Sequence, residues 1–539
     1  MGELGWADVG IVIGYFTLLS VLAFWASCRG KANGVKDYFL AGRNMLWVQI
    51  GASLFATNFG LNFFIGMSGS AAASGLGVTV YEWHAIFILI LLGWFFVPVY
   101  VSSGAYTMPQ YLKKRFGGKR LRTYLSLLSI FLLVVQRISV NMYSGALFVQ
   151  QAMGWNMYIS IISVTAFTTL FTILGGLSAI VWAHCFQIVA ILICSTYLTV
   201  LAFIRVGGME ALFEKYMMSA ANMTSCDPRM GLPREDSLHI FRDPVTSDVP
   251  WTGAVFGLTP MAILAFCTDQ VMVQRVLAAK THSHAKGGVI FAAWLKITPF
   301  FLVILPGMIG RVLFPDEIGC VEPELCMEVC ENPHGCSNLV YPKLIVELLP
   351  NFVRGLMTAG MLSALMGTLT SIFNSASSMF TLDLWPRCRP KASERELMVV
   401  SKVFIVGLMC TSLLWMPILE NNQGGQLWNY IQAMAAYIAP PFPVVFLLGV
   451  AWQRTTEQGA FWSLISGLLV GLTRLVLDIS YQKPACGETD TRPTLLSSVH
   501  FLHFAAIITV ISFVVCVVVS LCTQPRSEVQ VSCLSLLTD

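Results

Sequence analysis

The sequence predicts an all-α polytopic membrane protein. Of its 539 residues, 56% are hydrophobic and 12% are charged, whereas soluble chains carry about 25% charged residues. A soluble domain could not hide so much apolar surface. Apolar segments of about 20 residues recur along the chain, and each is long enough to cross a bilayer as a helix. The net charge of +4 does not indicate a nucleic-acid partner, because the basic residues lie in short loops between apolar segments. The lipid bilayer is therefore the first expected partner.

About thirteen spans are expected in chain order. The first is followed by Arg29 and Lys31 and not by a small-residue cleavage site, so we expect it to stay in the membrane as an anchor. The expected spans are 7–28, 46–69, 78–101, 123–149, 157–175, 178–205, 251–275, 287–312, 352–381, 398–418, 425–451, 459–479 and 499–522.

Basic residues gather in alternate loops and predict the orientation. KKRFGGKRLR (113–122) and RCRPKASER (387–395) belong to one set of loops, which is expected to face the cytoplasm. The N-terminus is then expected to be extracellular. The opposite loops carry a glycosylation sequon at Asn222 and four clustered cysteines, which favour disulfides outside the cell. A zinc site is the alternative for the cluster, although the spacing lacks a CxxC pair. The candidate disulfide cysteines are Cys226, Cys320, Cys326, Cys330, Cys336 and Cys486.

Two interrupted spans suggest an inverted repeat. ATNFGLN (56–62) brings Asn58 and a glycine to membrane depth, and FGLTPMAILAFCTDQ (256–270) contains Pro260. Matching interruptions in two halves of a chain point to the binding site of a secondary transporter. The alternative is a pair of kinked helices that pack through small residues.

The repeat defines the expected organisation of the chain. Residues 1–45 form an extra helix and a cytoplasmic loop, 46–206 the first five-helix repeat, and 207–250 an extracellular loop. Residues 251–452 form the second, inverted repeat with a Cys-rich loop at 315–345, and 453–539 hold the C-terminal helices and a short tail.

Several motifs together resemble the sodium/solute symporter family. They are DYFLAGRNM (37–45), GASLFATN (51–58), YLKKRFGGKR (111–120), ILGGLSA (173–179), CTDQVMVQR (267–275) and LTSIFNSAS (369–377). The branch that they resemble most is that of the animal sodium/glucose cotransporters, which includes hexose and myo-inositol carriers. The resemblance implies an inverted five-plus-five, LeuT-like core with one preceding and two following helices.

The resemblance also implies a sugar site. Placing an ionisable group inside an apolar span costs free energy, so such groups are functional candidates, which supports Glu82 and Lys296 independently. The alternatives are that Glu82 is an interfacial carboxylate and that Lys296 is a snorkelling lysine. Trp428 matches an outer aromatic gate. The expected substrate-binding positions are Asn58, Phe63, Glu82, Ala265, Phe266, Lys296, Trp428 and Gln432.

A sodium site follows from the same resemblance, and sodium prefers oxygen ligands. The two threonines could instead hydrogen-bond only to their own helix. The expected sodium-binding positions are Ala56, Phe59, Ala364, Gly367, Thr368 and Thr370, and the expected coupling positions are Arg137, Asn141, His184 and Asp269.

The chain departs from the family pattern at these sites. Gly367 replaces the first of two adjacent serines, and His184 and Asn141 stand where the family has aspartates. Ala265 and Phe266 replace a tyrosine and a tryptophan. Phe63 replaces a histidine, so sugar affinity should fall, since each lost hydrogen bond costs about 1 kcal/mol. His184 is either a titrating group or a packed side chain.

These observations predict a sodium-coupled symporter that imports a hexose or polyol across the plasma membrane by alternating access. The alternatives are a sugar sensor, an uncoupled or proton-coupled carrier, and a transport-impaired member of the family. The expected partners are Na⁺ as the co-transported ion and a small neutral sugar or polyol, with an accessory membrane subunit as a further candidate. No organic cofactor and no enzyme activity are expected, because no nucleophile–base, metal or phosphate-loop pattern stands out.

Overall fold

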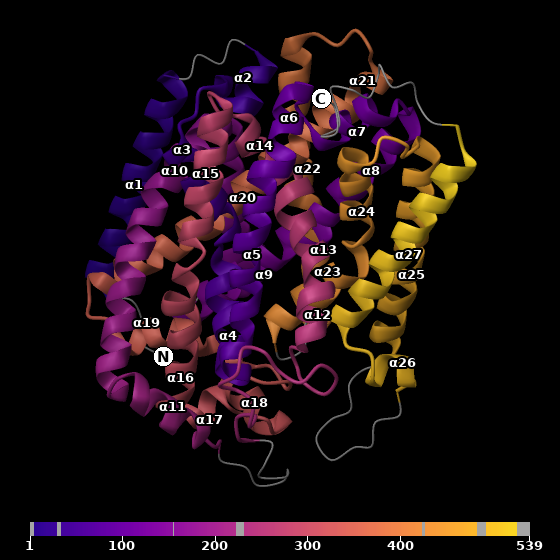
Figure 1. Ribbon diagram of the computed structural model, residues 1–539. Coiled ribbons are helices and arrows are strands. Elements are labelled where there is room, and N and C mark those ends of the chain that lie inside the picture. The colour runs from indigo at the N-terminus through magenta and orange to yellow at the C-terminus, as the bar shows by residue number, and fades with distance from the viewer. Residues whose placement is uncertain are drawn as a thin grey trace.

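The computed structural model describes residues 5–29, 34–154, 156–221, 231–422, 426–481 and 492–524. These residues form helices joined by loops, and their only β-pairing consists of two isolated bridges. The predicted all-α fold is confirmed (Figure 1). Asn222, Cys226 and Cys486 lie outside the described residues.

The N-terminal part and the first half of the chain hold the following helices. They are α1 (Trp6–Arg29), α2 (Val35–Leu40), η1 (Ala41–Arg43), α3 (Trp47–Asn58), η2 (Phe63–Met67), α4 (Ser68–Ser74), η3 (Gly75–Val78), α5 (Thr79–Leu91), η4 (Leu92–Phe96), α6 (Val97–Ser103), α7 (Met108–Phe116), α8 (Lys119–Leu132), η5 (Leu133–Ile138), α9 (Ser139–Met153), α10 (Met157–Val206) and α11 (Met209–Met217).

The second half begins after the loop that follows α11. Its helices are α12 (Trp251–Phe256), α13 (Leu258–Ile263), η7 (Leu264–Thr268), α14 (Gln270–Leu277), α15 (His282–Leu295), η8 (Phe300–Ile304), α16 (Leu305–Leu313), α17 (Pro315–Ile318), α18 (Pro323–Cys330), η9 (Ser337–Leu339), α19 (Val340–Leu348), α20 (Val353–Met379), η10 (Phe380–Leu384), α21 (Trp385–Cys388), α22 (Glu394–Asn422), α23 (Leu427–Ile438), α24 (Pro441–Ala451), α25 (Glu457–Ser480), α26 (Thr494–Ser497) and α27 (Phe501–Cys522).

Among the described residues, ten helices are long and apolar enough to cross a membrane, or eleven if the bent pair α23 and α24 counts as one span. The expected number was about thirteen. The difference arises because the stretch Phe63–Ser103 joins the expected span 78–101 to the end of the span 46–69, and Tyr158–Val206 takes in nearly all of two expected spans. Each stretch is interrupted at a glycine with left-handed φ, Gly75 at +74° and Gly176 at +56°. Only glycine adopts such a conformation without steric cost.

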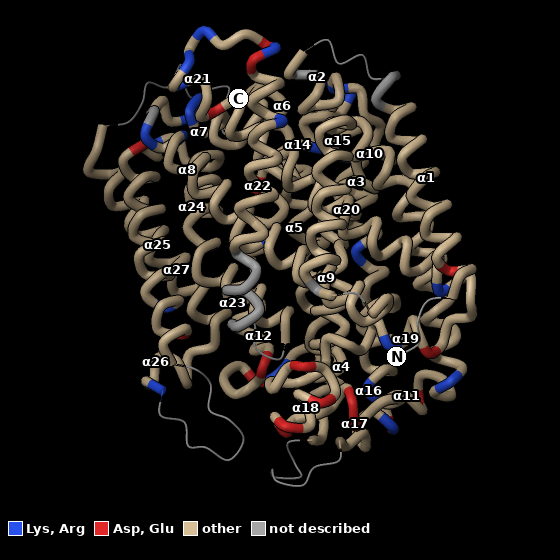
Figure 2. Tube along the Cα trace, turned by 180° about the vertical axis from the view of Figure 1, so that it is seen from behind, with Lys and Arg blue, Asp and Glu red and all other residues tan. Residues whose placement is uncertain are grey.

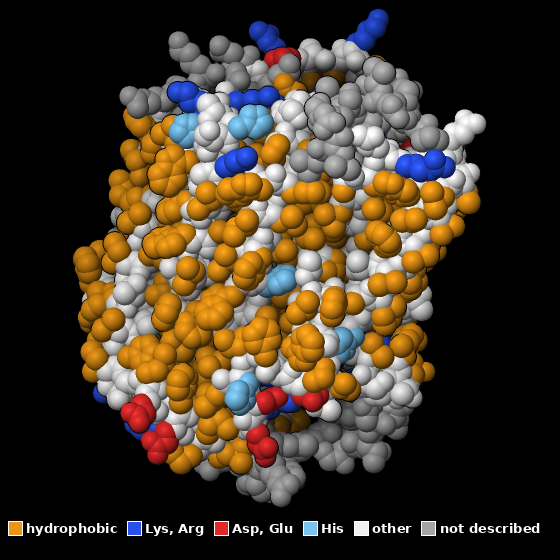
Figure 3. Space-filling view, in the orientation of Figure 1, with side chains coloured by type: hydrophobic (Ala, Val, Ile, Leu, Met, Phe, Trp, Pro, Cys, Tyr) orange, Lys and Arg blue, Asp and Glu red, His pale blue; other side chains and the backbone are white. Residues whose placement is uncertain are grey.

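Most charged side chains gather at the two ends of the bundle, and few lie in the band between them. Figure 2 shows this distribution along the trace, and Figure 3 shows one face of the band covered with apolar side chains. Trp94, Phe131, Leu170 and Phe301 are among the large apolar side chains that remain exposed. Such a belt suits contact with lipid, whereas a soluble monomer rarely exposes large continuous apolar patches.

The first helix break lies where the sequence predicted it. Helix α3 ends at Asn58, the chain is non-helical at Phe59 and Gly60, and helical structure resumes at Leu61. Non-helical backbone at membrane depth is tolerated only where it is enclosed by protein or lines a cavity. Phe59 and Leu61 are buried, so protein encloses this break.

The second interrupted segment, 256–270, contains two breaks: a turn at Gly257, just before Pro260, separates α12 from α13, and Asp269 separates η7 from α14. Pro260 lies in the first turn of α13, where the missing N–H suits the start of a helix. Asp269 has extended backbone angles, and its carboxylate accepts a hydrogen bond from the N–H of Val271 at the start of α14. Aspartate is a favoured N-terminal cap, and this cap marks the interruption.

Helix α20 is the most enclosed of the long helices. It packs against α10, α1 and α3, and so lies beside the first break. Every side chain from Met357 to Met379 is buried. The two breaks, α5 and α20 thereby surround the middle of the molecule, where the candidate site lies.

Candidate functional site

Three polar side chains meet beside the first break. The ammonium Nζ of Lys296 lies 2.8 and 3.0 Å from the two carboxylate oxygens of Glu82 on α5, and it also donates a hydrogen bond to the side-chain oxygen of Asn58 at the end of α3. The side chains of Lys296 and Glu82 are only 1% and 3% exposed. Lys296 therefore does not snorkel, and Glu82 is not an interfacial carboxylate.

Aromatic rings enclose this polar cluster. The Nζ of Lys296 lies 5.1 Å from the ring centroid of Phe63 and 5.3 Å from that of Phe266, within the range of a cation–π interaction. Phe63 in turn contacts the indole of Trp428 at 4.9 Å, and Tyr81 contacts the same indole at 5.6 Å. Trp428 is buried, so these rings close the cluster on the α23 side.

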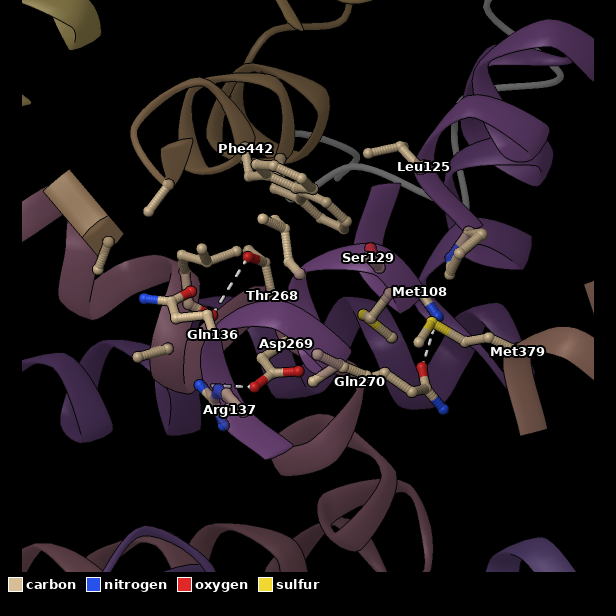
Figure 4. A pocket seen from close by; sticks show the side chains of 18 of the residues that line it. Met108, Leu125, Ser129, Gln136, Arg137, Thr268, Asp269, Gln270, Met379 and Phe442 are labelled. Atoms are coloured by element: carbon tan, nitrogen blue, oxygen red, sulfur yellow. Dashed lines mark hydrogen bonds and ion pairs between the residues drawn. The ribbon is translucent and has the colours of Figure 1, made fainter. Parts of the chain in front are cut away.

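A cavity of about 100 Å³ lies beside Ala265 and Thr268 (Figure 4). Ala265 forms part of its wall, at the position where the resemblance has a tyrosine. The cavity is also lined by Ala435 of α23 and Phe442 of α24. Small-molecule sites usually measure about 300–1,000 Å³, so this cavity would have to widen to admit a sugar. Gln432 is half-buried on α23, one turn after Trp428.

An ion pair forms the floor of the cavity. The guanidinium of Arg137 in η5 lies 2.8 Å from a carboxylate oxygen of Asp269 at the second break, as Figure 4 shows. The pair joins the first half of the chain to the second. Asp269 thus caps α14 with one carboxylate oxygen and binds Arg137 with the other.

The oxygens expected to bind sodium are gathered in part. Ala56 and Phe59 lie just before and within the first break, and α20, which carries the other four positions, packs against α3. The hydroxyl of Thr368 donates to the carbonyl of Ala364 at 3.0 Å, and that of Thr370 donates to the carbonyl of Gly367 at 2.9 Å. Both threonines therefore bond to their own helix, as the alternative interpretation predicted.

The carbonyl oxygen of Gly367 is heavily used. It accepts hydrogen bonds from Thr370 at 2.9 Å, from the hydroxyl of Ser371 at 2.7 Å, and from Nε2 of His184 at 3.1 Å. A carbonyl oxygen has two lone pairs. In this conformation the Gly367 carbonyl has no free lone pair to offer a sodium ion.

His184 belongs to a directed chain of hydrogen bonds. Nε of Arg275 donates to Oγ of Ser53 at 2.9 Å, and Oγ of Ser53 lies 2.9 Å from Nδ1 of His184. Because a carbonyl can only accept, Nε2 of His184 carries a proton and donates it to the carbonyl of Gly367. His184 is thus a packed, completely buried imidazole that is hydrogen-bonded at both ring nitrogens. Sequence reasoning singled out neither Ser53 nor Arg275.

The Cys-rich loop contains two disulfides in the structure. They join Cys320 to Cys326 and Cys330 to Cys336. The sulfur atoms of Cys320, Cys326 and Cys336 lie close enough together to suggest a metal site, but disulfide sulfurs cannot serve as thiolate ligands.

Ion pairs and hydrogen bonds hold the loop 231–250, which precedes α12. Arg242 is buried, bonds Asp248, and donates to the carbonyl of Ser74 at the end of α4. The hydrogen bond from Arg234 lowers the pKa of Asp236. These contacts fix the loop over the first broken span.

With this geometry in place, the chain can be compared with known proteins. The family model "Sodium:solute symporter family" matches residues 38–467. The chain therefore belongs to the sodium:solute symporter family, and Na⁺ is its co-transported ion.

Two curated relatives are similar over nearly the whole chain. The pig protein "Sodium/myo-inositol cotransporter 2" is 49% identical over 532 residues, which are 99% of this chain and 79% of that protein. The zebrafish protein "Sodium/glucose cotransporter 4" is 49% identical over 522 residues, 97% of this chain and 80% of that one. Among solved structures, a Na⁺-coupled sialic acid symporter in a substrate-bound outward-open state has a TM-score of 0.77, at 20% identity, and covers 97% of this chain and 99% of that one. This likeness confirms the predicted LeuT-like fold.

Proposed function

We propose that this protein is a sodium-coupled symporter that imports a hexose or a polyol such as myo-inositol. The observation that carries the proposal is the cluster of Asn58, Glu82 and Lys296 at a helix break, in a chain 49% identical to a sodium/myo-inositol cotransporter. The three residues offer an amide, a carboxylate and an ammonium. Together these groups can donate hydrogen bonds to the vicinal hydroxyls of a sugar and accept hydrogen bonds from them. Aromatic rings on both sides suit the apolar faces of a sugar ring.

The contacts also suggest the order of events. In this conformation the ammonium of Lys296 is bonded to Glu82 and Asn58, and no space remains between them. Sugar hydroxyls would replace part of these bonds, so that Glu82 and Lys296 stay satisfied during binding. The rings of Phe63 and Tyr81 on Trp428 close one side, while the cavity beside Ala265 offers the exit on the other side.

The location in the plasma membrane, with the N-terminus outside, is part of the same proposal. Two disulfides in one loop support an oxidising side of the membrane for that loop. Asn222 in the preceding loop would then be available for glycosylation. An enzyme activity is not proposed, because the polar cluster is an enclosed ion pair at a helix break.

A second candidate is transport with weak or no sodium coupling. It is favoured by one observation: the Gly367 carbonyl already accepts three side-chain hydrogen bonds, one of them from His184. A sodium ion at that carbonyl would have to displace one of them.

The test is uptake of labelled myo-inositol and labelled hexoses by cells that make the chain. Uptake is measured with sodium, with choline in place of sodium, and at several pH values. Uptake that requires sodium supports symport. Uptake that persists in choline favours the uncoupled carrier, and a sugar-evoked current without uptake favours a sensor.

A further inference from the structure

Three side-chain oxygens from separate parts of the chain converge beside Gly60 in the first helix break. The position that a Cβ on Gly60 would occupy lies 2.7 Å from Oγ1 of Thr368, 2.9 Å from Oδ1 of Asn62 and 3.3 Å from Oδ1 of Asn141. Thr368 comes from α20, Asn141 from α9, and Asn62 from the start of the helical segment after the break. The absence of a side chain at residue 60 is what allows them to approach one point.

Two of these oxygens have no hydrogen-bond partner. Oδ1 of Asn62 and Oδ1 of Asn141 are buried atoms without a donor among the described residues. Asn141 as a whole is 4% exposed, and its amide nitrogen donates to the carbonyl of Arg137 at 2.7 Å. That bond fixes the amide plane, so the unpartnered oxygen faces Gly60. Burying a polar atom without a partner costs free energy. Two such atoms beside one point therefore indicate that a ligand binds there.

The chemistry of the three oxygens indicates a monovalent cation. All three are oxygens, which hard cations prefer, and none is a carboxylate. Divalent ions in protein sites usually take carboxylate ligands. The hydroxyl of Thr368 donates its hydrogen to Ala364, which leaves its lone pairs free on the side of Gly60.

The surrounding residues explain why a cation would sit here. The Gly367 carbonyl is occupied by three donors. Ser53 and His184 link the guanidinium of Arg275 to this carbonyl. The positive charge of Arg275 disfavours a cation at the Gly367 carbonyl. The three oxygens beside Gly60 are neutral, and Arg137, whose backbone carbonyl accepts from Asn141, has its guanidinium paired with Asp269.

We infer that Asn62, Asn141 and Thr368 hold the sodium ion beside Gly60. This inference rests on the proposed sodium-coupled function and assigns its ion to side chains. No role was expected for Asn62 from the sequence, and Asn141 was expected only to affect coupling. The two amides give this chain a set of ligands that the resemblance did not imply.

The experiment measures ²²Na⁺ binding to the purified full chain without sugar, and the sodium dependence of sugar uptake. The variants are Asn62→Leu, Asn141→Leu and Gly60→Ala, whose added methyl would fill the point of convergence. Asn374→Leu is the matched control, because Asn374 is also buried, without a hydrogen-bond partner for either amide atom, and lies on α20. The sodium concentration for half-maximal binding should rise at least tenfold in the three variants and less than twofold in the control.

A variant that adds a charge distinguishes a changed sodium site from misfolding. Asn141→Asp keeps the size of the side chain and should lower the sodium concentration for half-maximal binding severalfold. Sodium curves within twofold of the unmodified chain in Asn62→Leu and Asn141→Asp would overturn the inference. It would also fail if the sugar concentration for half-maximal uptake shifted while ²²Na⁺ binding did not, because the amides would then bind sugar.

The outcomes separate this inference from the proposed function. If the unmodified chain binds ²²Na⁺, the variants do not, and the unmodified chain transports no sugar, the proposed function is contradicted and the sodium site is supported. An unmodified chain that does not bind ²²Na⁺ while importing sugar would remove the site and leave an uncoupled carrier.

Discussion

The imidazole of His184 occupies the space that a side chain at residue 367 would need. A Cβ on Gly367 would lie 2.9 Å from Nε2 of His184 and 2.6 Å from Oε1 of Gln187. His184 and Gly367 both depart from the family pattern, which has an aspartate at 184 and a serine at 367. The two departures are therefore linked by packing: the larger ring is accommodated by the missing side chain.

This relationship predicts that Gly367→Ser alone is destabilising. Overpacking a close-packed core costs about 1–3 kcal/mol, so we expect a lower melting temperature for the purified protein. The double variant His184→Asp with Gly367→Ser should recover the part of that loss that comes from the imidazole, since the smaller carboxylate makes room while Gln187 stays in place. Equal loss of stability in the single and the double variant would show that the two positions are independent.

The ion pair of Glu82 and Lys296 predicts a non-additive mutant cycle. Removing one partner of a buried pair leaves an uncompensated charge, which costs about 3–5 kcal/mol. Glu82→Gln and Lys296→Met should each be strongly destabilised. The double variant should be more stable than either, because no charge is then buried. Thermal unfolding of all four proteins gives the coupling; additive effects would contradict a direct pair.

The sugar cluster predicts weaker binding when its hydrogen bonds are removed. Asn58→Ala deletes an acceptor that contacts Lys296, and Gln432→Ala deletes an amide one turn after Trp428. Each lost bond of about 1 kcal/mol corresponds to about a fivefold rise in the sugar concentration for half-maximal uptake. Thr358→Ala on α20 is a suitable control, since its hydroxyl is buried and makes none of the contacts described for the sugar cluster. Unchanged apparent affinity in both variants would remove them from the pocket.

The cavity beside Ala265 predicts a gate that can be rebuilt. Ala265→Tyr should fill the cavity, which measures about 100 Å³, and should slow labelling of a cysteine placed at Ser129 in its wall. The rate of reaction of Ser129→Cys with a thiol reagent, with and without Ala265→Tyr, measures this. The chain without Ser129→Cys gives the background from its exposed cysteines. Equal labelling rates would mean that the cavity is not closed by residue 265.

Much of the fold follows from sequence because lipid imposes simple rules. Long apolar segments predicted the helices, and polar residues at Asn58 predicted the first break correctly. The interrupted segment 256–270 was recognised from Pro260, and the structure has a turn at Gly257 just before that proline. A further signal was missed: Asp269 is a helix cap between two helices, and a cap within a span reveals an interruption.

Two residues that meet in the candidate site, Glu82 and Lys296, were predictable from the sequence, but most of the contacts were not. Ionisable residues in apolar spans pointed to Glu82 and Lys296, which the structure joins. The hydrogen bonds of His184 could not be predicted, since Ser53 lies 131 residues away in the chain and its role depends on tertiary packing. Asn62 drew no assignment from the sequence, because nothing in the sequence places it opposite Asn141.

The most direct test of the account is initial uptake of labelled myo-inositol by the unmodified chain and by Glu82→Gln, measured in sodium and in choline. The account predicts rapid uptake in sodium by the unmodified chain, uptake near background in choline, and a severalfold higher half-saturating sugar concentration for Glu82→Gln. The same sodium-independent uptake in both media, with no effect of Glu82→Gln, would contradict it.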